Sequence, residues 1–410
     1  MYTKGCIAMI LAGGHGKRLG SLTHYYSKPA IYFGGNNNRI IDFTLNNCSN
    51  SGIETIGVLS QLFSSDLNTY INNIYEWNPE ANGVYTLTPA SDKSPYSGTA
   101  DAVYKNIEFV DRFNPDNVLI LSGDHIYKMD YKKIINFHQK KGAALTVAAT
   151  PVPKEEASRF GILNADDTSS VYGFEEKPFC PKSNLASMGI YVFKWSTLKK
   201  YLLIDSGDTK SRHDFGKNIL PRMLYNCESV YTYMFNQYWK DVGTVDSLWE
   251  ANMDQIVYRT ISDRNAAGQS IIADGCSIFG KVEHSVLGCS VTIGKGSEIV
   301  NSVIMPNVYI GSNVKIYNTI VGANAIIMDD TEIGTDKGTD FFIDRKICSN
   351  GISLVSPWLY IGEGIKFRGN SHIYKELLEE WNSSIGISKF SVHWMFREKK
   401  SNAAENLSTD

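Results

Sequence analysis

The sequence predicts an α/β protein in which a doubly wound, mostly parallel sheet is followed by a parallel β-helix of hexapeptide repeats. Two patterns carry this prediction. Short apolar runs alternate with amphipathic segments over roughly the first 260 residues, as in sheets whose parallel strands are joined by helices. From about residue 271 aliphatic residues recur every six positions, which is typical of stacked coils of parallel strands.

Five apolar runs are predicted to form the strands of the sheet, because each is short and is bounded by turn residues. Amphipathic helices are predicted over 99–111 and over 244–257, the second with Val245, Leu248, Trp249, Ile256 and Val257 on one face. Ligands of such sheets bind beyond the carboxyl ends of the strands. The predicted strands are 5–12, 54–60, 117–123, 144–152 and 186–193.

The six-residue period includes Val308, Val314, Ile320 and Ile326, and glycine repeatedly follows an aliphatic residue in this region. Coils of this type bury their aliphatic residues only against neighbouring coils, and they often supply oligomer contacts. We therefore expect a catalytic-type domain over 1–258, a short linker over 259–270, a β-helix over 271–361 and a C-terminal extension over 362–410. The extension begins with a predicted helix at KELLEEW and ends in a polar tail with the composition of a disordered segment.

Composition excludes several classes of function. The net charge is -3 and no polybasic run occurs, which argues against nucleic-acid and membrane partners. Seven cysteines form no C-x-x-C pair, as expected for reduced thiols in the cytoplasm. The apolar run near the N-terminus is too short for a membrane span. These features predict a soluble cytoplasmic protein.

A glycine-rich turn, LAGGHGKRLG, follows the first predicted strand at residues 11–20. It does not have the spacing of a Walker loop, because Leu11 stands where the first glycine belongs, nor that of a dinucleotide loop, because Gly20 comes one residue late. Glycines beside Lys17 and Arg18 nevertheless let bare amides and cations approach an anion. The turn is therefore either a polyphosphate site or an ordinary solvated turn.

Four charged residues stand at positions that suit a metal and phosphate site. Asp124 directly follows a predicted strand and Asp241 precedes a predicted helix, and carboxylates of this kind hold Mg²⁺, although each could instead cap a helix or stabilise a turn. Lys28 and Lys177 each precede a proline, which favours extended backbone. Zinc-ligand clusters and a nucleophile elbow are lacking in the sequence.

Taken together, the motifs of this chain resemble those of one family, the glucose-1-phosphate adenylyltransferases or ADP-glucose pyrophosphorylases of bacterial glycogen synthesis. The resemblance covers roughly residues 5–360, and HDFGK, SNLASMGIY and YWKDVGT are its most specific parts. It implies a Rossmann-like nucleotidyltransferase domain followed by a left-handed β-helix. The motifs are LAGGHGKRL, KPA, FGG with RIIDF, NCSNSG, GTADAV, LSGDHIYKMDY, SRFGI, EEKP, SNLASMGIYVF, HDFGKNILP and YWKDVGTVDSLWEANMD.

The resemblance implies that ATP and glucose 1-phosphate give ADP-glucose and pyrophosphate, with Arg18, Lys28 and Asp124 as catalytic residues. It places the triphosphate on Gly13, Gly14, Gly16 and Arg18, and Mg²⁺ on Asp124 and Asp241. Glucose 1-phosphate is expected on Tyr96, Gly161, Glu176, Lys177 and Ser187. The phosphate of the sugar has a second pKa near about 6, so its oxygen needs no general base at neutral pH. A homotetramer, or an oligomer with a related subunit, is the implied assembly.

The chain departs from the family pattern around Tyr96, where Pro95 and Ser97 stand in place of a tryptophan and a basic residue. Two alternatives therefore stay open: a weakly active or regulatory subunit of a hetero-oligomer, and a transferase that uses UTP or dTTP. A β-helix acyltransferase is a third alternative, with His284 as its one histidine within the first repeats.

Overall fold

The computed structural model describes residues 5–14, 16–61, 64–74, 83–89, 94–262 and 270–384. The chain forms two compact units, and each contains three separate segments. The first unit is made of Met1–His15, Tyr26–Ala30 and Arg39–Asp241, and the second of Gly16–Tyr25, Ile31–Asn38 and Val242–Asp410. The expected boundary at residue 258 divided the chain into two continuous stretches. The second unit also contains two segments from near the N-terminus.

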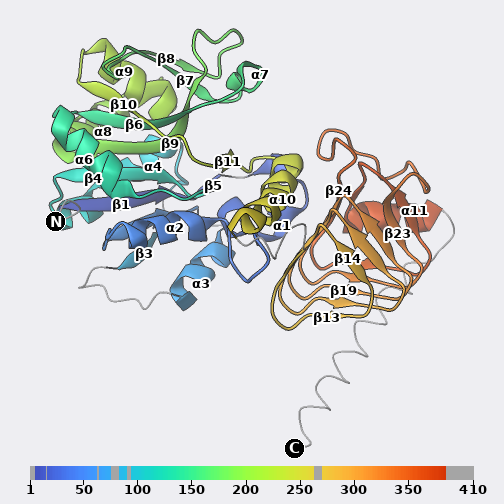
Figure 1. Cartoon of the computed structure of the whole chain (residues 1–410). Helices are drawn as coiled ribbons and strands as arrows, with labels where there is room; N and C mark the ends of the chain where they lie inside the picture. The colour runs from blue at the N-terminus through green and yellow to red at the C-terminus, as the bar shows by residue number, and fades with distance from the viewer. Residues whose placement is uncertain are drawn as a thin grey trace, which may run out of the picture. The chain divides into compact units, whose positions relative to one another are not determined.

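The first unit is built on a sheet whose main path has the strand order β10-β6-β9-β4-β1-β2-β3 (Figure 1). All five predicted strands are present, and β3 and β10 extend the sheet at its two ends. Four of the six neighbouring pairs on this path are parallel. The strands are β1 (Cys6–Leu11), β2 (Ile56–Leu59), β3 (Val84–Leu87), β4 (Asn117–Ser122), β6 (Leu145–Pro151), β9 (Leu185–Lys194) and β10 (Val230–Met234).

Strand β9 runs antiparallel to both of its neighbours, although the regular alternation of strands and helices predicted a parallel strand. A parallel return requires a long crossover, usually a helix. The hairpin of β7 (Gly161–Ala165) and β8 (Val171–Glu176) precedes β9 instead, and β7 also pairs antiparallel with β9. The chain therefore enters β9 from the opposite end of the sheet.

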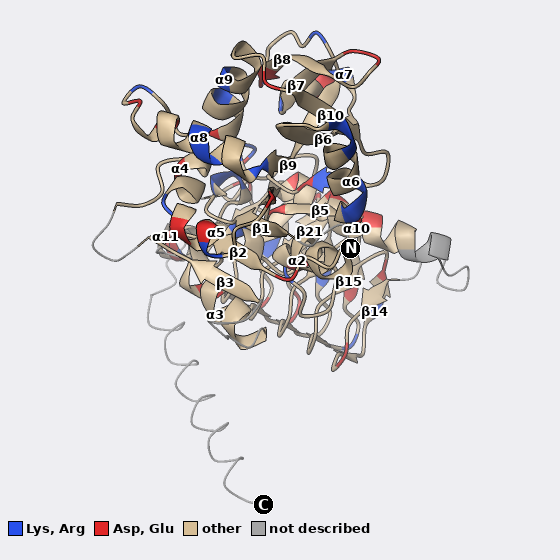
Figure 2. Cartoon of the chain, turned by 90° about the vertical axis from the view of Figure 1, so that its left-hand side faces the viewer, with Lys and Arg blue, Asp and Glu red and all other residues tan. Residues whose placement is uncertain are grey.

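Helices cover both faces of this sheet, as a doubly wound fold requires. Successive residues of β1 face opposite clusters, with Ile7 and Met9 in one and Ala8 and Ile10 in the other. The first cluster is covered by α4 (Thr99–Tyr104) and α8 (Trp195–Ser206), the second by α2 (Ile41–Asn50) and α6 (Tyr131–Lys141). Figure 2 shows Lys and Arg on α6, α8 and α9 (Leu220–Tyr225), so the basic charge is spread over several elements.

The predicted helix 99–111 is two helices, α4 and α5 (Ile107–Arg112), with the break at Asn106. The side-chain amide of Asn106 donates to the Ala102 carbonyl oxygen at 2.8 Å and to the Tyr96 hydroxyl at 3.0 Å. Asparagine side chains that bond the local backbone compete with helix continuation. The remaining short helices of this unit are α3 (Ser65–Ile74), α7 (Lys154–Ala157), η2 (Lys28–Ala30) and the π-helical turn η3 (Phe215–Ile219).

The second unit contains a parallel β-helix with three sheets. Val286 pairs with Val303 and Val303 with Ile320, so one coil advances 17 residues and not the 18 of three strict hexapeptides. One sheet contains β12 (Ile271–Ile272), β15 (Val286–Leu287), β18 (Val303–Ile304), β21 (Thr319–Val321), β24 (Ser353–Val355) and β27 (His372–Ile373). The others contain β13 (Ser277–Ile278), β16 (Thr292–Ile293), β19 (Tyr309–Ile310), β22 (Ile326–Ile327) and β25 (Tyr360–Ile361), and β14 (Lys281–Glu283), β17 (Glu298–Val300), β20 (Lys315–Tyr317), β23 (Glu332–Thr335) and β26 (Lys366–Arg368).

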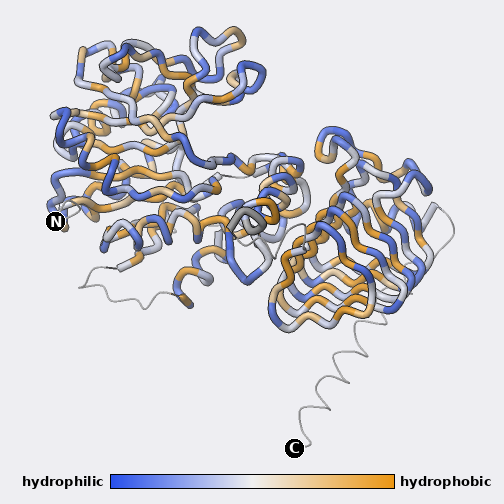
Figure 3. Tube along the Cα trace, viewed as in Figure 1, coloured by the Kyte–Doolittle hydropathy of each residue, from blue (hydrophilic) through white to orange (hydrophobic). Residues whose placement is uncertain are grey.

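Side-chain ladders hold the coils in register. The buried hydroxyl of Ser302 accepts from the Thr319 backbone N–H, and Ser285 accepts in the same way from Ser302. At the corners of the coils Asn307 and Asn324 have positive φ, because asparagine tolerates the left-handed region. Their side chains are joined by a hydrogen bond of 3.2 Å. Figure 3 shows apolar segments recurring from coil to coil.

The β-helix continues past residue 361, where the sequence pattern had placed its end, because β26 and β27 extend it to Ile373. The predicted helix at KELLEEW is confirmed as α11 (Lys375–Ser384). The polar tail from residue 385 lies outside the described residues. Among the described helices, none combines the length and the apolar character that crossing a bilayer requires.

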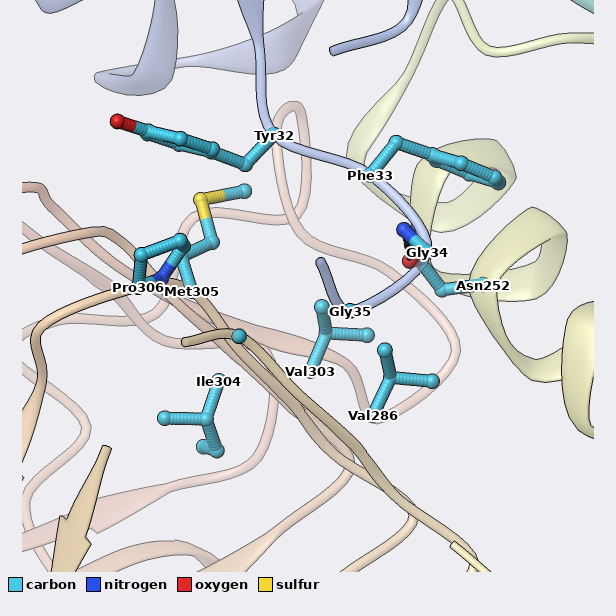
Figure 4. Close-up of a pocket in the computed structure, with 11 residues that line it drawn as sticks. Tyr32, Phe33, Gly34, Gly35, Asn252, Val286, Val303, Ile304, Met305 and Pro306 are labelled. Atoms are coloured by element: carbon cyan, nitrogen blue, oxygen red, sulfur yellow. Dashed lines mark hydrogen bonds between the residues drawn. The ribbon is translucent and has the colours of Figure 1, made fainter. Parts of the chain in front are cut away.

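Helix α10 (Val245–Ser262) confirms the predicted helix at 244–257 and belongs to the second unit. It reaches four residues into the expected linker, whose residues 263–269 are outside the described part of the chain. The Trp249 indole N–H donates to the Asn301 carbonyl oxygen at 2.7 Å, and the Asn252 side chain accepts from the Gly34 backbone N–H at 3.0 Å. Figure 4 shows the Gly34–Gly35 segment between Asn252 and the coil residues Val286 and Val303.

Candidate functional site

A cluster of charged side chains forms in the first unit where β4 ends. Asp124 follows this strand after Gly123, whose missing side chain permits the turn because a Cβ there would lie 3.0 Å from Ile10 Cγ2. The next strand, β5 (His125–Tyr127), pairs antiparallel with β11 (Trp239–Asp241), and this ladder sets Asp241 opposite His125. The two predicted metal aspartates, far apart in sequence, are thereby brought together.

Lys28 lies between these two carboxylates. Its Nζ is 2.7 Å from Asp124 Oδ2 and 3.0 Å from Asp241 Oδ1, and its side chain is only 8% exposed. The residue opens η2 directly before Pro29. The ammonium thus bridges both aspartates and offsets one of their two negative charges in a mostly buried position, where charge interactions are stronger than at the surface.

The pKa shifts of Asp124 and Lys28 favour the charged state of both groups. Burial alone would raise the pKa of the Asp124 carboxyl, but the charges of Lys28 and then His125 outweigh burial and hold that pKa well below its usual range. Burial alone would lower the pKa of the Lys28 ammonium, but Asp124 and Asp241 outweigh it and raise that pKa. Ser122 also donates its hydroxyl to Asp124 Oδ1.

His125 is a member of this cluster that the sequence analysis gave no role. Its Nε2 lies 3.6 Å from Asp124 Oδ1 and 3.9 Å from Asp241 Oδ1. The signal was available, because His125 immediately follows Asp124 within the quoted LSGDHIYKMDY motif. Its position opposite Asp241 depends on the β5–β11 pairing, which sequence patterns do not predict.

The donor set fits a divalent cation. Ligand atoms of Asp124, His125 and Asp241 all lie within 4.8 Å of one another. Carboxylate oxygens are the protein ligands that Mg²⁺ prefers, and Mg²⁺ usually takes one or two carboxylates together with phosphate oxygens. The residues present are therefore chemically suited to the ion that the resemblance implied.

The glycine-rich turn is divided between the two units: Gly13 and Gly14 belong to the first, Gly16 and Arg18 to the second. A Cβ added at Gly14 would meet nothing within 4 Å, so this part of the turn is open. Gly16 has φ 57°, a left-handed conformation, and precedes the short helix η1 (Lys17–Leu19), in which Arg18 is exposed. Gly14 is thus open in the first unit, and the Arg18 guanidinium is exposed in the second.

A second group of predicted site residues surrounds the hairpin in the first unit. Gly161 pairs with Glu176 across β7 and β8, and a Cβ at Gly161 would lie 3.1 Å from a Glu176 carboxylate oxygen. Burial, and then the neighbouring Asp214, raise the pKa of Glu176. Ser187 on β9 contacts the Tyr191 hydroxyl at 3.5 Å, and burial raises the pKa of Tyr191 to about 12.

Two of the predicted sugar-phosphate residues differ from expectation in their local structure. Lys177 is exposed and has φ 50°, so its backbone is left-handed and not extended as the following proline had indicated. Tyr96 lies in the core of the unit, and its hydroxyl already donates to the Leu87 carbonyl oxygen at 3.2 Å while accepting from Asn106. The structure thus engages the Tyr96 hydroxyl in the scaffold, and a direct sugar contact by it stays a prediction.

The GTADAV and HDFGK motifs meet beside this second group. Thr99 donates its hydroxyl to Asp214 Oδ2 at 3.1 Å and accepts from the Phe215 backbone N–H at 3.0 Å. Gly98 permits the contact, because a Cβ there would lie 2.3 Å from the His213 carbonyl oxygen. Both motifs were quoted for the resemblance, yet Thr99 and Asp214 received no individual role, since their proximity depends on the tertiary fold.

Comparisons with known proteins cover both the sheet-based part of the chain and the β-helix. Residues 7–256 match the family model described as nucleotidyl transferase, and residues 254–355 match that of the GlmU-like, C-terminal hexapeptide. A glucose-1-phosphate adenylyltransferase of Clostridium beijerinckii is 51% identical over 80% of this chain and 92% of its own length. The protein of the same name from Desulfitobacterium hafniense is 42% identical over 92% of this chain and 100% of its own length.

The chain belongs to the glucose-1-phosphate adenylyltransferases. A further adenylyltransferase with this name, from Clostridioides difficile, is 49% identical over 74% of the chain. Membership in this nucleotidyltransferase family accounts for both units, whereas the acyltransferase alternative explained only the β-helix. The family model that covers 7–256 contains the whole lysine–aspartate cluster.

Proposed function

We propose that this glucose-1-phosphate adenylyltransferase homologue transfers the adenylyl group of ATP to α-D-glucose 1-phosphate, giving ADP-glucose and pyrophosphate. The observation that carries the proposal is the position of Lys28 between Asp124 and Asp241. A mostly buried cation and two carboxylates at a strand end are the groups that hold polyphosphate and a divalent ion together.

The reaction needs charge stabilisation and positioning more than acid–base catalysis. The attacking oxygen of glucose 1-phosphate is already anionic at neutral pH, so no residue has to remove a proton. The chain must bring two anions together and stabilise the pyrophosphate as it leaves. We assign the triphosphate to Gly13, Gly14, Gly16 and Arg18, with Lys28 contributing its ammonium.

For the sugar phosphate we assign Lys177 to the phosphate and Glu176, Gly161, Ser187 and Tyr96 to the remaining contacts. The half-buried Glu176 carboxylate and the Ser187 hydroxyl are polar groups of the kind that orient sugar hydroxyls.

Asp124 and Asp241 are the residues that would hold Mg²⁺. When bound, the ion would supply positive charge that offsets the charge of the reacting phosphates. Lys28 pairs with both carboxylates and holds the pKa of Asp124 low, so Asp124 is ionised before any cation arrives.

We further propose that the product serves glycogen or another α-glucan, that the enzyme is cytoplasmic, and that it forms a homotetramer. Retention of Arg18, Lys28, Asp124, Lys177 and Asp241 supports a working enzyme over a regulatory subunit. An apparent mass in solution of four chains by light scattering is expected, and a monomer would contradict the assembly.

The proposed reaction is tested by incubating purified protein with Mg²⁺, glucose 1-phosphate and each nucleoside triphosphate in turn, and measuring released pyrophosphate. Turnover with ATP well above that with UTP or dTTP is expected. A preference for UTP or dTTP would replace the adenylyl assignment, and no turnover with any nucleotide would favour the regulatory subunit.

The metal assignment is tested by Asp124→Asn, which keeps the shape of the side chain and removes its charge. We expect kcat to fall at least about a hundredfold, as when a single charge-stabilising group is lost from an active site. Asp166→Asn, in an exposed turn of the same unit, is the matched control and should keep full activity. Retained activity in Asp124→Asn would contradict the assignment.

A further inference from the structure

The imidazole of His125 is held in a fixed orientation by contacts on its Nδ1 side. Nδ1 lies 3.1 Å from the Met188 carbonyl oxygen and 3.3 Å from the Trp239 indole Nε1, and the His125 and Trp239 rings pack edge to face at 5.3 Å. Histidines that bind metals usually donate their other ring N–H to a carboxylate or a backbone carbonyl. The Met188 carbonyl oxygen accepts from Nδ1 in the tautomer that carries its proton there, and the Trp239 indole N–H donates to Nδ1 in the other tautomer.

The other ring nitrogen is directed at the two carboxylates without bonding either of them. Its distances of 3.6 Å to Asp124 Oδ1 and 3.9 Å to Asp241 Oδ1 are longer than a hydrogen bond, and within the described part of the chain no hydrogen bond to Nε2 is formed. Nε2 thus faces two carboxylate oxygens, and a cation bound between the three atoms would offset the negative charge of the two carboxylates.

The spacing of the three atoms suits one shared ion. Two ligand atoms bonded to a six-coordinate ion at about 2.1 Å lie roughly 3.0 Å apart at right angles and roughly 4.2 Å apart across the ion. The measured separations of 3.6 Å and 3.9 Å lie between these two values, so a small rotation of the side chains would bring the atoms to the separations of shared ligands. Lys28 bonds Asp124 Oδ2 and Asp241 Oδ1, so Asp124 Oδ1 is the oxygen that lies on the side of His125 away from Lys28, where it also accepts from Ser122.

We infer that His125 Nε2 is a third protein ligand of the divalent cation held by Asp124 and Asp241. The inference rests on the proposed function, because it concerns the cation of that same site. A donor set of two carboxylates and one imidazole raises affinity for transition ions relative to Mg²⁺, because these ions accept a nitrogen ligand more readily while Mg²⁺ favours oxygen; Mn²⁺ is the paramagnetic ion of this class that also accepts oxygen ligands.

The direct test is electron paramagnetic resonance of Mn²⁺ added to the metal-free full-length protein, with inorganic pyrophosphate as a nitrogen-free anion. Pulsed spectra should show coupling to an imidazole ¹⁴N in the parent protein. The coupling should disappear in His125→Ala and His125→Asn, and Mn²⁺ should bind at least about tenfold more weakly, with a smaller change for Mg²⁺. His284→Asn, which changes a histidine of the second unit, should leave the spectrum unchanged.

The Asp241→Asn variant shows whether the Mn²⁺ seen in the spectra is bound at this site. Mn²⁺ binding that depends on Asp241 but shows no ¹⁴N coupling would overturn the role of His125 and leave the two-aspartate site standing. If Mn²⁺ does not bind, or if its binding does not depend on Asp241, both the role of His125 and the two-aspartate site are overturned. Circular dichroism of each variant separates loss of a ligand from loss of folding, and coupling that persists in a folded His125→Asn protein would also overturn the inference.

Discussion

Lys28 shows how much of a residue's role depends on its tertiary surroundings. The sequence places it before a proline, a position shared by many surface lysines. Its function depends on Asp124 and Asp241, which reach it through the end of β4 and through the pairing of β5 with β11. Both aspartates could be predicted from their positions beside a strand and a helix. The resemblance named Lys28 as a catalytic residue, but its pairing with both aspartates, and the place of His125 beside them, required the fold.

Removing the Lys28 charge should destabilise the protein in a way that divalent cations reverse. In Lys28→Met two aspartates are left without their cation in a mostly buried site, a loss that costs about 3 kcal/mol of unfolding free energy when a buried pair is broken. We expect a lower Tm in EDTA and a partial recovery in Mg²⁺, measured by calorimetry. Lys199→Met, which removes an exposed pair with Asp111, should cost less than about 1 kcal/mol and should not respond to Mg²⁺. Equal responses of the two variants to Mg²⁺ would contradict the prediction.

His138 should make the stability of the first unit depend on pH. It is 2% exposed and bonded to the Thr146 hydroxyl at 2.9 Å, and burial lowers its pKa from 6.5 to about 4. As the pH falls, His138 is therefore protonated in the unfolded chain before it is protonated in the folded protein. The contribution of neutral His138 to the unfolding free energy is fully present above pH 6.5 and is lost as the pH falls toward 4. The loss amounts to at most about 3 kcal/mol.

Chemical denaturation of the parent protein and of His138→Gln from pH 7 to pH 4 checks this. The difference in unfolding free energy between the two proteins should shrink as the pH falls through this range. A difference that stays constant with pH would show that His138 does not titrate on unfolding.

At the scale of elements, the sequence predicted which segments are strands and helices better than how they connect. Periodicity located the five strands, because it reports burial along one segment. It did not predict the direction of β9 or the break between α4 and α5. The first depends on a hairpin replacing a crossover helix, and the second on one asparagine side chain that bonds Ala102 and Tyr96.

Gly98 gives a test of how the GTADAV helix and the HDFGK loop are coupled. Alanine at this position would place Cβ 2.3 Å from the His213 carbonyl oxygen and 2.4 Å from that of Arg212, so the loop must shift. Because Thr99 and Asp214 bond across the contact, we expect KM for glucose 1-phosphate to rise. Stability should fall by about 1–3 kcal/mol, the usual cost of overpacking.

Steady-state kinetics with each substrate varied separately measures the effect. Gly83→Ala is the matched control, since a Cβ there meets nothing within 4 Å. If Gly98→Ala raised KM for both substrates equally, the contact would not be specific to the sugar phosphate.

At the scale of the whole molecule, the second unit includes part of the glycine-rich turn. The backbone N–H of Ser21 donates to His372 Nε2 at 3.2 Å across a separation of 351 residues, and Gly20 has no room for a side chain beside this ring. The linear sequence predicted both units as folds. It did not predict that residues 16–25 would pack on the last coil, since no local pattern reports such a distant partner.

His372→Ala should therefore affect the nucleotide although the residue belongs to the β-helix. Losing the acceptor leaves the buried Ser21 N–H unsatisfied, at a cost of about 1–3 kcal/mol, and loosens the turn that carries Arg18. We expect a higher KM for ATP and an unchanged KM for glucose 1-phosphate in initial-rate assays. His284→Asn, elsewhere in the β-helix, should change neither value, and an unchanged KM for ATP in a folded His372→Ala protein would separate this contact from nucleotide binding.

The three-segment composition of each unit has a consequence for recombination between relatives. The chain passes from one unit to the other five times, four of them before residue 40. A chimera joined at residue 241 would exchange only the last segment of the second unit and would leave residues 16–25 and 31–38 from the other parent. Their contacts with α10 and the coils, such as Gly34 with Asn252 and Ser21 with His372, would then join side chains of different ancestry. A functional exchange of the β-helix must carry these two N-terminal segments with it.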